Sequence, residues 1–336
     1  MPFTFTNQIA MKKVIFLIIP MWVSVANAQT TTQPFHFSVV QSVGTDGTDS
    51  KNHDYYFSFN LISGTVNSVK GVEIGALYNQ NEGDMTGFQS SGLLNVTKGS
   101  VTGYQTAGLT NISGDVKGLQ NGGLSNHAKN VEGVQTAGLV NTARDVFGVQ
   151  LSGIVNKATH LKGYQIGLVN VADSVEKGGG IGLVNLYKKG GYREVEISVA
   201  DYQNVGLSYK SGVKFLYSII SVGYNFLDTP LFSAGFGIGS RTGLGANWFL
   251  KPELVWYNYL TKDLSFNTAT QSSHLRLGIM KRANKLSLTL YPSVYYANVP
   301  KGLEGDLTKI GEFKPFAQNK HGQFGFGLGL GVAFLK

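Results

Sequence analysis

The central part of the chain repeats a unit of 15 residues with the pattern G-φ-Q-x-x-G-L-x-N, in which φ is apolar. Successive units begin at Gly103, Gly118, Gly133, Gly148 and Gly163. The recurring amides are Gln105, Gln120, Gln135, Gln150 and Gln165, followed by Asn111, Asn126, Asn141, Asn156 and Asn170. Weaker copies extend the array to residues 71–190. Because one such unit cannot bury its own apolar face, several must stack against one another.

A second period of five residues runs through the same array. Small residues recur at this spacing, for example at Gly118, Gly123 and Ala128. Small residues let a backbone turn or approach its neighbour closely, so this spacing predicts the three-sided coil of a β-solenoid. The glutamines and asparagines would then stack as amide ladders along the axis. The alternative is a meander with one strand and one turn per unit. Apolar residues that recur inside those turns, such as Val116 and Val131, favour the solenoid.

From residue 191 onward the chain changes to longer alternating strands. In the last of them, large apolar residues from Phe324 to Phe334 alternate with Gly and Ala. An apolar outer face with a small inner face over about ten residues is typical of a transmembrane β-strand. We therefore predict an antiparallel, outer-membrane-type β-barrel over residues 191–336, with residues 35–62 as candidate extra strands. A soluble sandwich, the alternative, would show polar residues on its solvent face.

Polar and aromatic residues of these strands are candidates for two places in the barrel. The predicted lumen-lining residues are Glu194, Glu196, Arg241, Glu253 and Arg276. They would either line a pore or simply satisfy one another inside the barrel. The predicted interfacial aromatic girdle consists of Trp248, Trp256, Tyr257 and Tyr259.

Residues 1–28 have the features of a secretory signal peptide. A basic pair next to Met11 precedes a short apolar run, and small residues predict cleavage between Ala28 and Gln29. Met11 is a second candidate for the translation start. The apolar run is too short to cross a bilayer as a helix. We assign residues 29–70 to a linker and N-terminal strands.

Composition and motif searches exclude several classes of function. The chain has no cysteine, which excludes disulfides, thiolate metal sites and a cysteine nucleophile. Its net charge is +8, but no run of Lys or Arg is longer than Lys188–Lys189, so we expect no nucleic-acid partner. The six histidines lack metal-ligand spacing, and no set of residues has the order of a catalytic triad. We therefore expect no catalytic residue, no cofactor, no metal and no enzymatic activity.

The in-phase repeats resemble the leptospiral-type surface-repeat family, which is also frequent in exported proteins of the Bacteroidota. The segment Val195–Ser198, together with Tyr209–Gly212 and Leu216–Tyr224, is similar to the segment that follows such repeats. The resemblance covers roughly residues 55 to 226. It implies an envelope protein and carries no catalytic residues.

These patterns together predict an all-β protein with a β-solenoid-like repeat array and an outer-membrane-type barrel. The expected location is the outer membrane or cell surface of a Gram-negative bacterium. The expected partners are outer-membrane lipid and an unidentified surface ligand, and the expected role is structural, surface-display or adhesive. Two alternatives remain open, a small-solute outer-membrane channel and a soluble periplasmic or secreted repeat adhesin.

Overall fold

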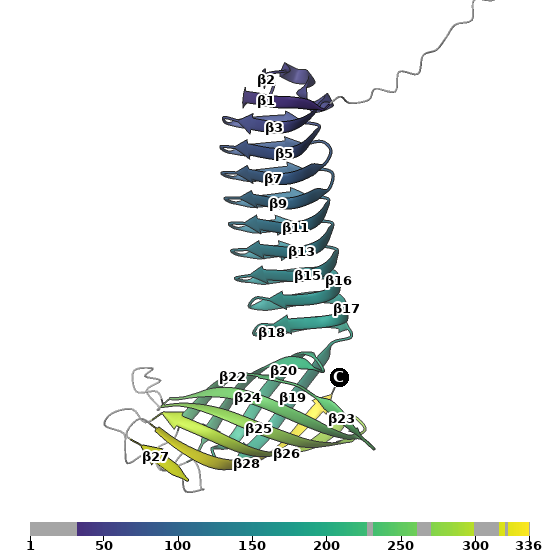
Figure 1. Ribbon diagram of the computed structural model, residues 1–336. Helices are drawn as coiled ribbons and strands as arrows, with labels where there is room; N and C mark the ends of the chain where they lie inside the picture. The colour runs from purple at the N-terminus through teal and green to yellow at the C-terminus, as the bar shows by residue number, and fades with distance from the viewer. Residues whose placement is uncertain (1–31, 227–230, 261–269, 299–315, 320–321, 336) are drawn as a thin grey trace, which may run out of the picture.

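The structure is a computed structural model that describes residues 32–226, 231–260, 270–298, 316–319 and 322–335. Residues 33–189 form a β-solenoid of about 9 turns, and residues 192–335 form a closed antiparallel barrel of 8 strands (Figure 1). The predicted all-β class and both predicted architectures are confirmed. The predicted signal peptide, with its cleavage site between Ala28 and Gln29, lies outside the described residues.

Long and short strands alternate along the solenoid. In chain order they are β1 (Gln33–Val40), β2 (Val43–Gly44), β3 (Asp54–Asn60), β4 (Ser63–Val66), β5 (Ser68–Gly75), β6 (Tyr78–Asn81), β7 (Met85–Ser91), β8 (Leu94–Thr97), β9 (Val101–Ala107), β10 (Thr110–Ser113), β11 (Asp115–Gly122), β12 (Ser125–His127), β13 (Asn130–Ala137), β14 (Val140–Thr142), β15 (Asp145–Ser152), β16 (Val155–Ile166), β17 (Val169–Ile181) and β18 (Val184–Lys189). A 3-10 helix, η1 (Gly47–Asn52), lies between β2 and β3.

Strands of successive coils pair in parallel, with the same repeat position in register. Gln120 of β11 lies opposite Gln135 of β13, which lies opposite Gln150 of β15. A meander would pair adjacent units in antiparallel, so that alternative is wrong. The bend within each long strand falls at the repeat glycine. Gly133 has φ +138°, and a Cβ there would lie 2.0 Å from the carbonyl oxygen of Gly118. Only glycine fits this corner because a side chain would collide with the backbone of the preceding coil.

The interior of the solenoid consists of one apolar column between the polar ladders. Its members are at most 1 % exposed, and they are Val69, Met85, Val101, Val116, Val131, Val146 and Leu161. The third small position of the repeat also faces inward, where Ala143 and Ala158 are buried. A coil this narrow has room for few large side chains, which explains the five-residue spacing of small residues.

Residues 35–62 belong to the solenoid and not to the barrel. β1 pairs with β3 in parallel, and β3 pairs with β5 in the same sense. The prediction that this segment adds strands to the barrel is therefore wrong, and the array begins earlier than residue 71. Its first coils escaped the repeat pattern because their polar interior column contains His36, Ser58 and Glu73 instead of glutamine.

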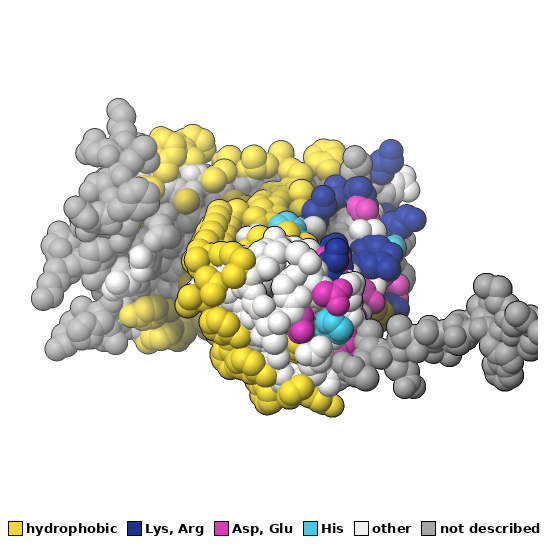
Figure 2. Space-filling view, turned by 90° about the horizontal axis from the view of Figure 1, so that it is seen from above, with side chains coloured by type: hydrophobic (Ala, Val, Ile, Leu, Met, Phe, Trp, Pro, Cys, Tyr) yellow, Lys and Arg dark blue, Asp and Glu magenta, His cyan; other side chains and the backbone are white. Residues whose placement is uncertain are grey.

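The outer surface of the solenoid is divided into an apolar side and a charged side (Figure 2). The apolar wall centres on a column of leucines and one isoleucine that are 41–48 % exposed: Leu77, Leu93, Leu109, Leu124, Leu139, Ile154, Leu168 and Leu183. A second apolar column consists of Val72, Phe88, Tyr104, Leu119, Val134, Val149 and Tyr164. Between the two lies the mixed column Ile74, Ser90, Thr106, Asn121, Thr136, Leu151 and Ile166. The charged face carries surface ion pairs, among them Lys117–Glu132 and Lys162–Glu176.

The barrel is built from long strands in antiparallel order. They are β19 (Tyr192–Ala200), β20 (Gln203–Val213), β21 (Leu216–Asn225), β22 (Leu231–Gly239), β24 (Trp248–Leu260), β25 (Thr270–Ala283), β26 (Leu286–Asn298) and β28 (Gly322–Leu335). Two short strands, β23 (Thr242–Gly245) and β27 (Ala317–Asn319), pair with β24 and β28. Pairing of β19 with β28 closes the barrel.

Side chains of the barrel alternate between an apolar outside and a small or polar inside, as the sequence predicts for β28. Phe324, Phe326 and Leu328 are exposed, whereas the glycines between them are buried. The predicted aromatic girdle is half wrong. Trp248 and Trp256 are 42 % and 41 % exposed, but Tyr257 and Tyr259 are buried. Tyr257 and Tyr259 are separated from Glu253 by an even number of residues along β24, so their side chains point inward as that of Glu253 does. Residues of an outward girdle would have to occupy the alternate positions of the strand.

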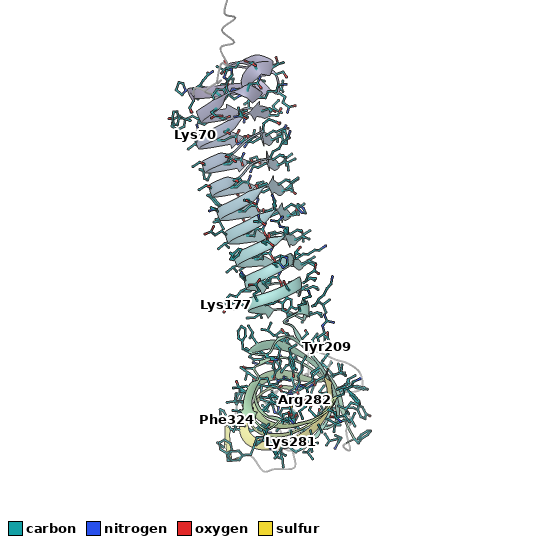
Figure 3. The ribbon with its side chains drawn as sticks, turned by 90° about the vertical axis from the view of Figure 1, so that its right-hand side faces the viewer. Lys70, Lys177, Tyr209, Lys281, Arg282 and Phe324 are labelled. Atoms are coloured by element: carbon teal, nitrogen blue, oxygen red, sulfur yellow. The ribbon has the colours of Figure 1, made fainter. Side chains whose placement is uncertain are left out.

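The last coils of the solenoid rest on the side of the barrel, against the turn between β20 and β21 (Figures 1 and 3). The backbone N–H of Asn185 donates to Ser211 Oγ at 3.0 Å, and Asn185 Nδ2 donates to Ser218 Oγ at 2.9 Å. Val213, at the end of β20, is buried in the same cluster as the solenoid core. Figure 3 looks along the barrel, and the solenoid stands away from its side.

Candidate functional site

The most concentrated polar site lies inside the barrel. Its members are at most 2 % exposed, and they are Glu194, Glu196, Lys210, Lys251, Glu253, Arg276 and Tyr291. They come from five strands, β19, β20, β24, β25 and β26, and all occupy inward positions of the alternation. We call this set the lumen cluster.

Two lysines hold the carboxylates of the lumen cluster together. Lys210 Nζ lies 3.0 Å from both carboxylate oxygens of Glu196 and 2.9 Å from Glu253 Oε1. Lys251 Nζ lies 2.6 Å from Glu194 Oε1. Both ammonium groups donate to the hydroxyl of Tyr291, at 2.8 and 3.0 Å, and that hydroxyl donates to Glu196 Oε2 at 2.6 Å. Each lysine is therefore surrounded by acceptors from different strands.

Arg276 completes the cluster from β25. Its Nη2 lies 2.7 Å from Glu253 Oε2, and its Nε donates to the same oxygen at 2.9 Å. The guanidinium also donates to Tyr257 Oη at 3.2 Å. The cluster thus contains three carboxylates and three cations, which sum to zero formal charge. Buried charges are tolerated when they are paired and hydrogen-bonded in this way.

Glycines on the inner face of the barrel make room for the lumen cluster. A Cβ on Gly278 would lie 2.6 Å from a ring carbon of Tyr291, and one on Gly331 would lie 2.9 Å from the carboxyl carbon of Glu196. Above and below the cluster the interior is occupied by buried tyrosines: Tyr192, Tyr202, Tyr217, Tyr259 and Tyr295. The Gly-rich pattern of β28 thus serves both membrane-type alternation and a filled interior.

Four of the five predicted lumen-lining residues meet in this cluster: Glu194, Glu196, Glu253 and Arg276. Arg241 does not join them, because it follows β22 in the connection to β24. Its guanidinium lies over the rings of Tyr192 and Phe249, 4.9 and 4.5 Å from their centroids. Lys210, Lys251 and Tyr291 were missed, although strand parity could have found them. Lys251, for example, is two residues from Glu253 and so faces the same side.

The predicted glutamine ladder is present in the solenoid, and its hydrogen bonds all run one way. Each Nε2 donates to Oε1 of the preceding coil, as from Gln165 to Gln150 at 2.8 Å and from Gln105 to Gln89 at 2.6 Å. The same bond links the predicted members between them, Gln150, Gln135, Gln120 and Gln105. The ladder ends on Glu73, whose Oε2 accepts from Gln89 at 2.7 Å.

The predicted asparagine ladder is also present, and its hydrogen bonds run in the opposite direction. Each Nδ2 donates to Oδ1 of the next coil, at 2.9–3.0 Å along Asn111, Asn126, Asn141, Asn156 and Asn170. The last donor of this ladder is Asn185, which bonds to the barrel through Ser211 and Ser218. The ladders therefore fix the stacking register and tie it to the barrel, and neither presents a reactive group to solvent.

Glu73 is the acidic end of the glutamine ladder. It is fully buried, and burial raises its pKa to about 7, against hydrogen bonds from Gln89 foremost that favour the ionised form. A carboxyl whose pKa is raised on folding does not reduce the stability of the fold below its unfolded pKa near 4.5. The loss of stability grows as the pH rises above 4.5 and is complete above about 7, where the buried carboxyl is ionised. The shift corresponds to an upper limit of about 3 kcal/mol.

Replacement of this carboxyl, Glu73→Gln, is expected to stabilise the solenoid at high pH only. We expect a gain of about 1–3 kcal/mol at pH 8 and almost none at pH 4, because the amide keeps the ladder without a charge. The measurement is denaturant unfolding of the full chain in detergent micelles, followed by far-UV circular dichroism at both pH values. Glu132→Gln, on the charged face, is the control and should change stability equally little at both. A gain from Glu73→Gln that does not depend on pH would contradict the assignment.

Searches of the described residues and comparisons with known proteins add no second candidate site. Among the residues that the structure describes, no group of three or more His, Cys, Asp or Glu is arranged to hold a metal ion. Within the same residues, no helix is long and apolar enough to span a membrane. No protein-family model matches the chain, and comparison with curated proteins gives no match. The case for function therefore rests on the geometry of the barrel and the solenoid.

Proposed function

We propose that this protein is an outer-membrane protein whose barrel is a plugged anchor and whose solenoid is a non-catalytic structural element. The observation that carries the proposal is the two-sided barrel, apolar outside and filled by a neutral ionic cluster inside. A belt of exposed Leu, Ile, Val and Phe on long antiparallel strands is the surface that lipid favours. In water such a belt would be a large unpartnered apolar patch. The soluble-adhesin alternative therefore fits less well.

The channel alternative is disfavoured by the contents of the lumen. A conducting barrel needs a continuous polar path, and small barrels have an interior just wide enough for side chains to fill it. Here the lumen cluster and the inward tyrosines occupy that space. Purified protein in a planar bilayer should give no conductance steps. Reproducible conductance steps that disappear when Lys210 is replaced would instead support the channel function.

Charge on the lipid-facing side of β28 tests membrane insertion. Leu330→Arg is expected to cost about 2–4 kcal/mol if that position lies near the middle of the bilayer. We expect the wild type to fractionate with the outer membrane and to shift its gel mobility on heating. The variant should show a smaller membrane-bound, heat-modifiable fraction.

The matched control is Thr142→Arg, which places the same side chain in the solenoid opposite Lys157 of the next coil. It should fractionate like the wild type, because that position carries a polar or charged side chain in both coils. Recovery of the wild-type chain in a soluble periplasmic fraction would reject the anchor.

A further inference from the structure

The apolar wall of the solenoid is the largest surface that the barrel anchor leaves unexplained. Its leucine column continues from Leu77 to Leu183 through backbone hydrogen bonds between neighbours, such as Leu124 N–H to Leu109 O at 2.8 Å. At about 4.8 Å per coil the column is about 34 Å long. The columns on its two sides, from Ile74 to Ile181 and from Tyr78 to Val184, include Ser and Thr but no Asp, Glu, Lys or Arg. Monomeric soluble proteins rarely expose so long an apolar strip.

The direction of this wall relative to the barrel indicates its partner. The end of the barrel that we call the short-turn end has connections at residues 214–215, 240–247 and 284–285. The other end has connections at residues 201–202, 226–230, 261–269 and 299–321, which include the two longest, 261–269 and 299–321. In outer-membrane barrels the short turns face the periplasm and the longer loops face outward. The solenoid contacts the barrel at the short-turn end, through Val213. It therefore lies on the periplasmic side in this orientation.

The solenoid axis lies across the barrel axis, so it runs in the plane of the membrane (Figures 1 and 3). In Figure 2 the apolar wall faces left and the charged face looks right. Figure 1, which has the same left and right, shows β27, at the end with the long connections, on the left and β23, at the short-turn end, on the right. The wall is thus directed into the bilayer and the charged face away from it. The apolar outer belt of the barrel and the apolar wall of the solenoid belong to separate parts of the chain. Both are consistent with the same orientation of the protein in the membrane.

Basic residues at the short-turn end support this placement. Lys214, Lys281, Arg282 and Lys285 are exposed there, and Figure 3 shows Lys281 and Arg282 on that end of the barrel. Exposed cations at the membrane surface attract anionic lipid headgroups. The headgroup layer would then lie at the level where the solenoid joins the barrel.

We propose that the solenoid is a monotopic lipid-binding element whose apolar wall is embedded in the periplasmic leaflet beside the barrel. Amphipathic elements bind an interface in this way when one face is apolar and the opposite face is charged. The inference rests on the proposed membrane anchor and goes beyond it, because a barrel alone gives the wall no partner. It also replaces the expectation of cell-surface display with a periplasmic position parallel to the membrane.

The absence of cysteine makes a direct test possible. Single variants Leu124→Cys on the wall, Lys129→Cys on the charged face of the same coil, and Leu277→Cys on the barrel belt are labelled with a polarity-sensitive fluorophore. The full chain is reconstituted in phosphatidylethanolamine–phosphatidylglycerol vesicles with and without nitroxide-labelled lipid. We expect the Leu124 and Leu277 probes to be blue-shifted and quenched several times more strongly than the Lys129 probe.

The three probes separate the possible failures. A quenched Leu277 probe beside an unquenched Leu124 probe would overturn the lipid-binding wall and leave the barrel anchor intact. An unquenched Leu277 probe would overturn the anchor and the inference together. A Leu124 probe that is blue-shifted without lipid quenching, and loses this shift as the protein is diluted, would assign the wall to contact with a second copy of the chain.

Discussion

Lys210→Met is expected to destabilise the barrel by about 3–5 kcal/mol, the cost of removing one partner from a buried ion pair. The lysine is fully buried, forms ion pairs with three carboxylates, of which Glu194 is the most distant at 3.3 Å, and donates to the hydroxyl of Tyr291. Its loss leaves three carboxylates with two cations. Glu253 keeps Arg276, but Glu196 keeps only Lys251, at 3.5 Å, and Tyr291. Glu196 is therefore the group left with an uncompensated charge.

The measurement is the temperature at which the heat-modifiable band converts to its unfolded mobility in detergent. Lys214→Met, four residues beyond Lys210 and exposed in the turn after β20, is the control and should leave this temperature unchanged. The double variant Lys210→Met/Glu196→Gln restores neutrality and should recover much of the loss. If Lys210→Met alone behaves like the control, the cluster does not stabilise the barrel. If the double variant is no better than the single one, packing and not charge explains the effect.

The solenoid was predictable because its constraints are local and periodic. Each coil must turn at a glycine and fill a narrow interior, so the same residue type returns at the same position. The ladders follow from that register, since Gln120 can only lie opposite Gln105 and Gln135. The first coils were missed where the period slips. His36 lies opposite Ser58, a step of 22 residues, whereas the later step from Gln120 to Gln135 is 15.

Contacts between barrel strands that are distant in sequence were harder to predict. Alternation predicts which residues face the lumen, and it was applied correctly to Glu194 and Glu253 but not to Tyr257 and Tyr259. Which inward residues meet depends on strand order and on the stagger of a closed barrel, neither of which is local. Arg241 shows the limit of prediction from residue type alone. It was predicted to line the lumen with the other charged residues, but it stacks on two aromatic rings near the end of a strand.

The position of the solenoid on the barrel had no sequence signal at all. It depends on Asn185 meeting Ser211 and Ser218, residue types that carry no directional pattern. Amphipathicity of the solenoid was likewise hidden, because a leucine that recurs once per coil fits an interior position as well as an exposed one. In a coil, inward and outward positions both recur in phase, and the structure is needed to tell them apart.

Gly133→Ala is expected to disrupt the middle of the solenoid, at a cost of about 4 kcal/mol. Two effects add at this site. A φ of +138° is strained for any residue with a side chain, which costs on the order of 1–3 kcal/mol. The new methyl group would also lie 2.0 Å from the carbonyl oxygen of Gly118, so the coils must separate, and overpacking of this kind costs a further ~1–3 kcal/mol.

Because each coil contacts only its neighbours, this damage should stay within the array. Limited proteolysis of the full chain in detergent should cut the variant within the coils around residue 133 under conditions that leave the wild type intact, while the barrel keeps its heat-modifiable mobility. Glu132→Ala is the matched control on the adjacent exposed position, and it loses only the surface pair with Lys117. Protease resistance of Gly133→Ala equal to that of the control would mean that the coil corner tolerates a side chain. Loss of the heat-modifiable barrel in the same variant would show that solenoid and barrel fold as one cooperative unit.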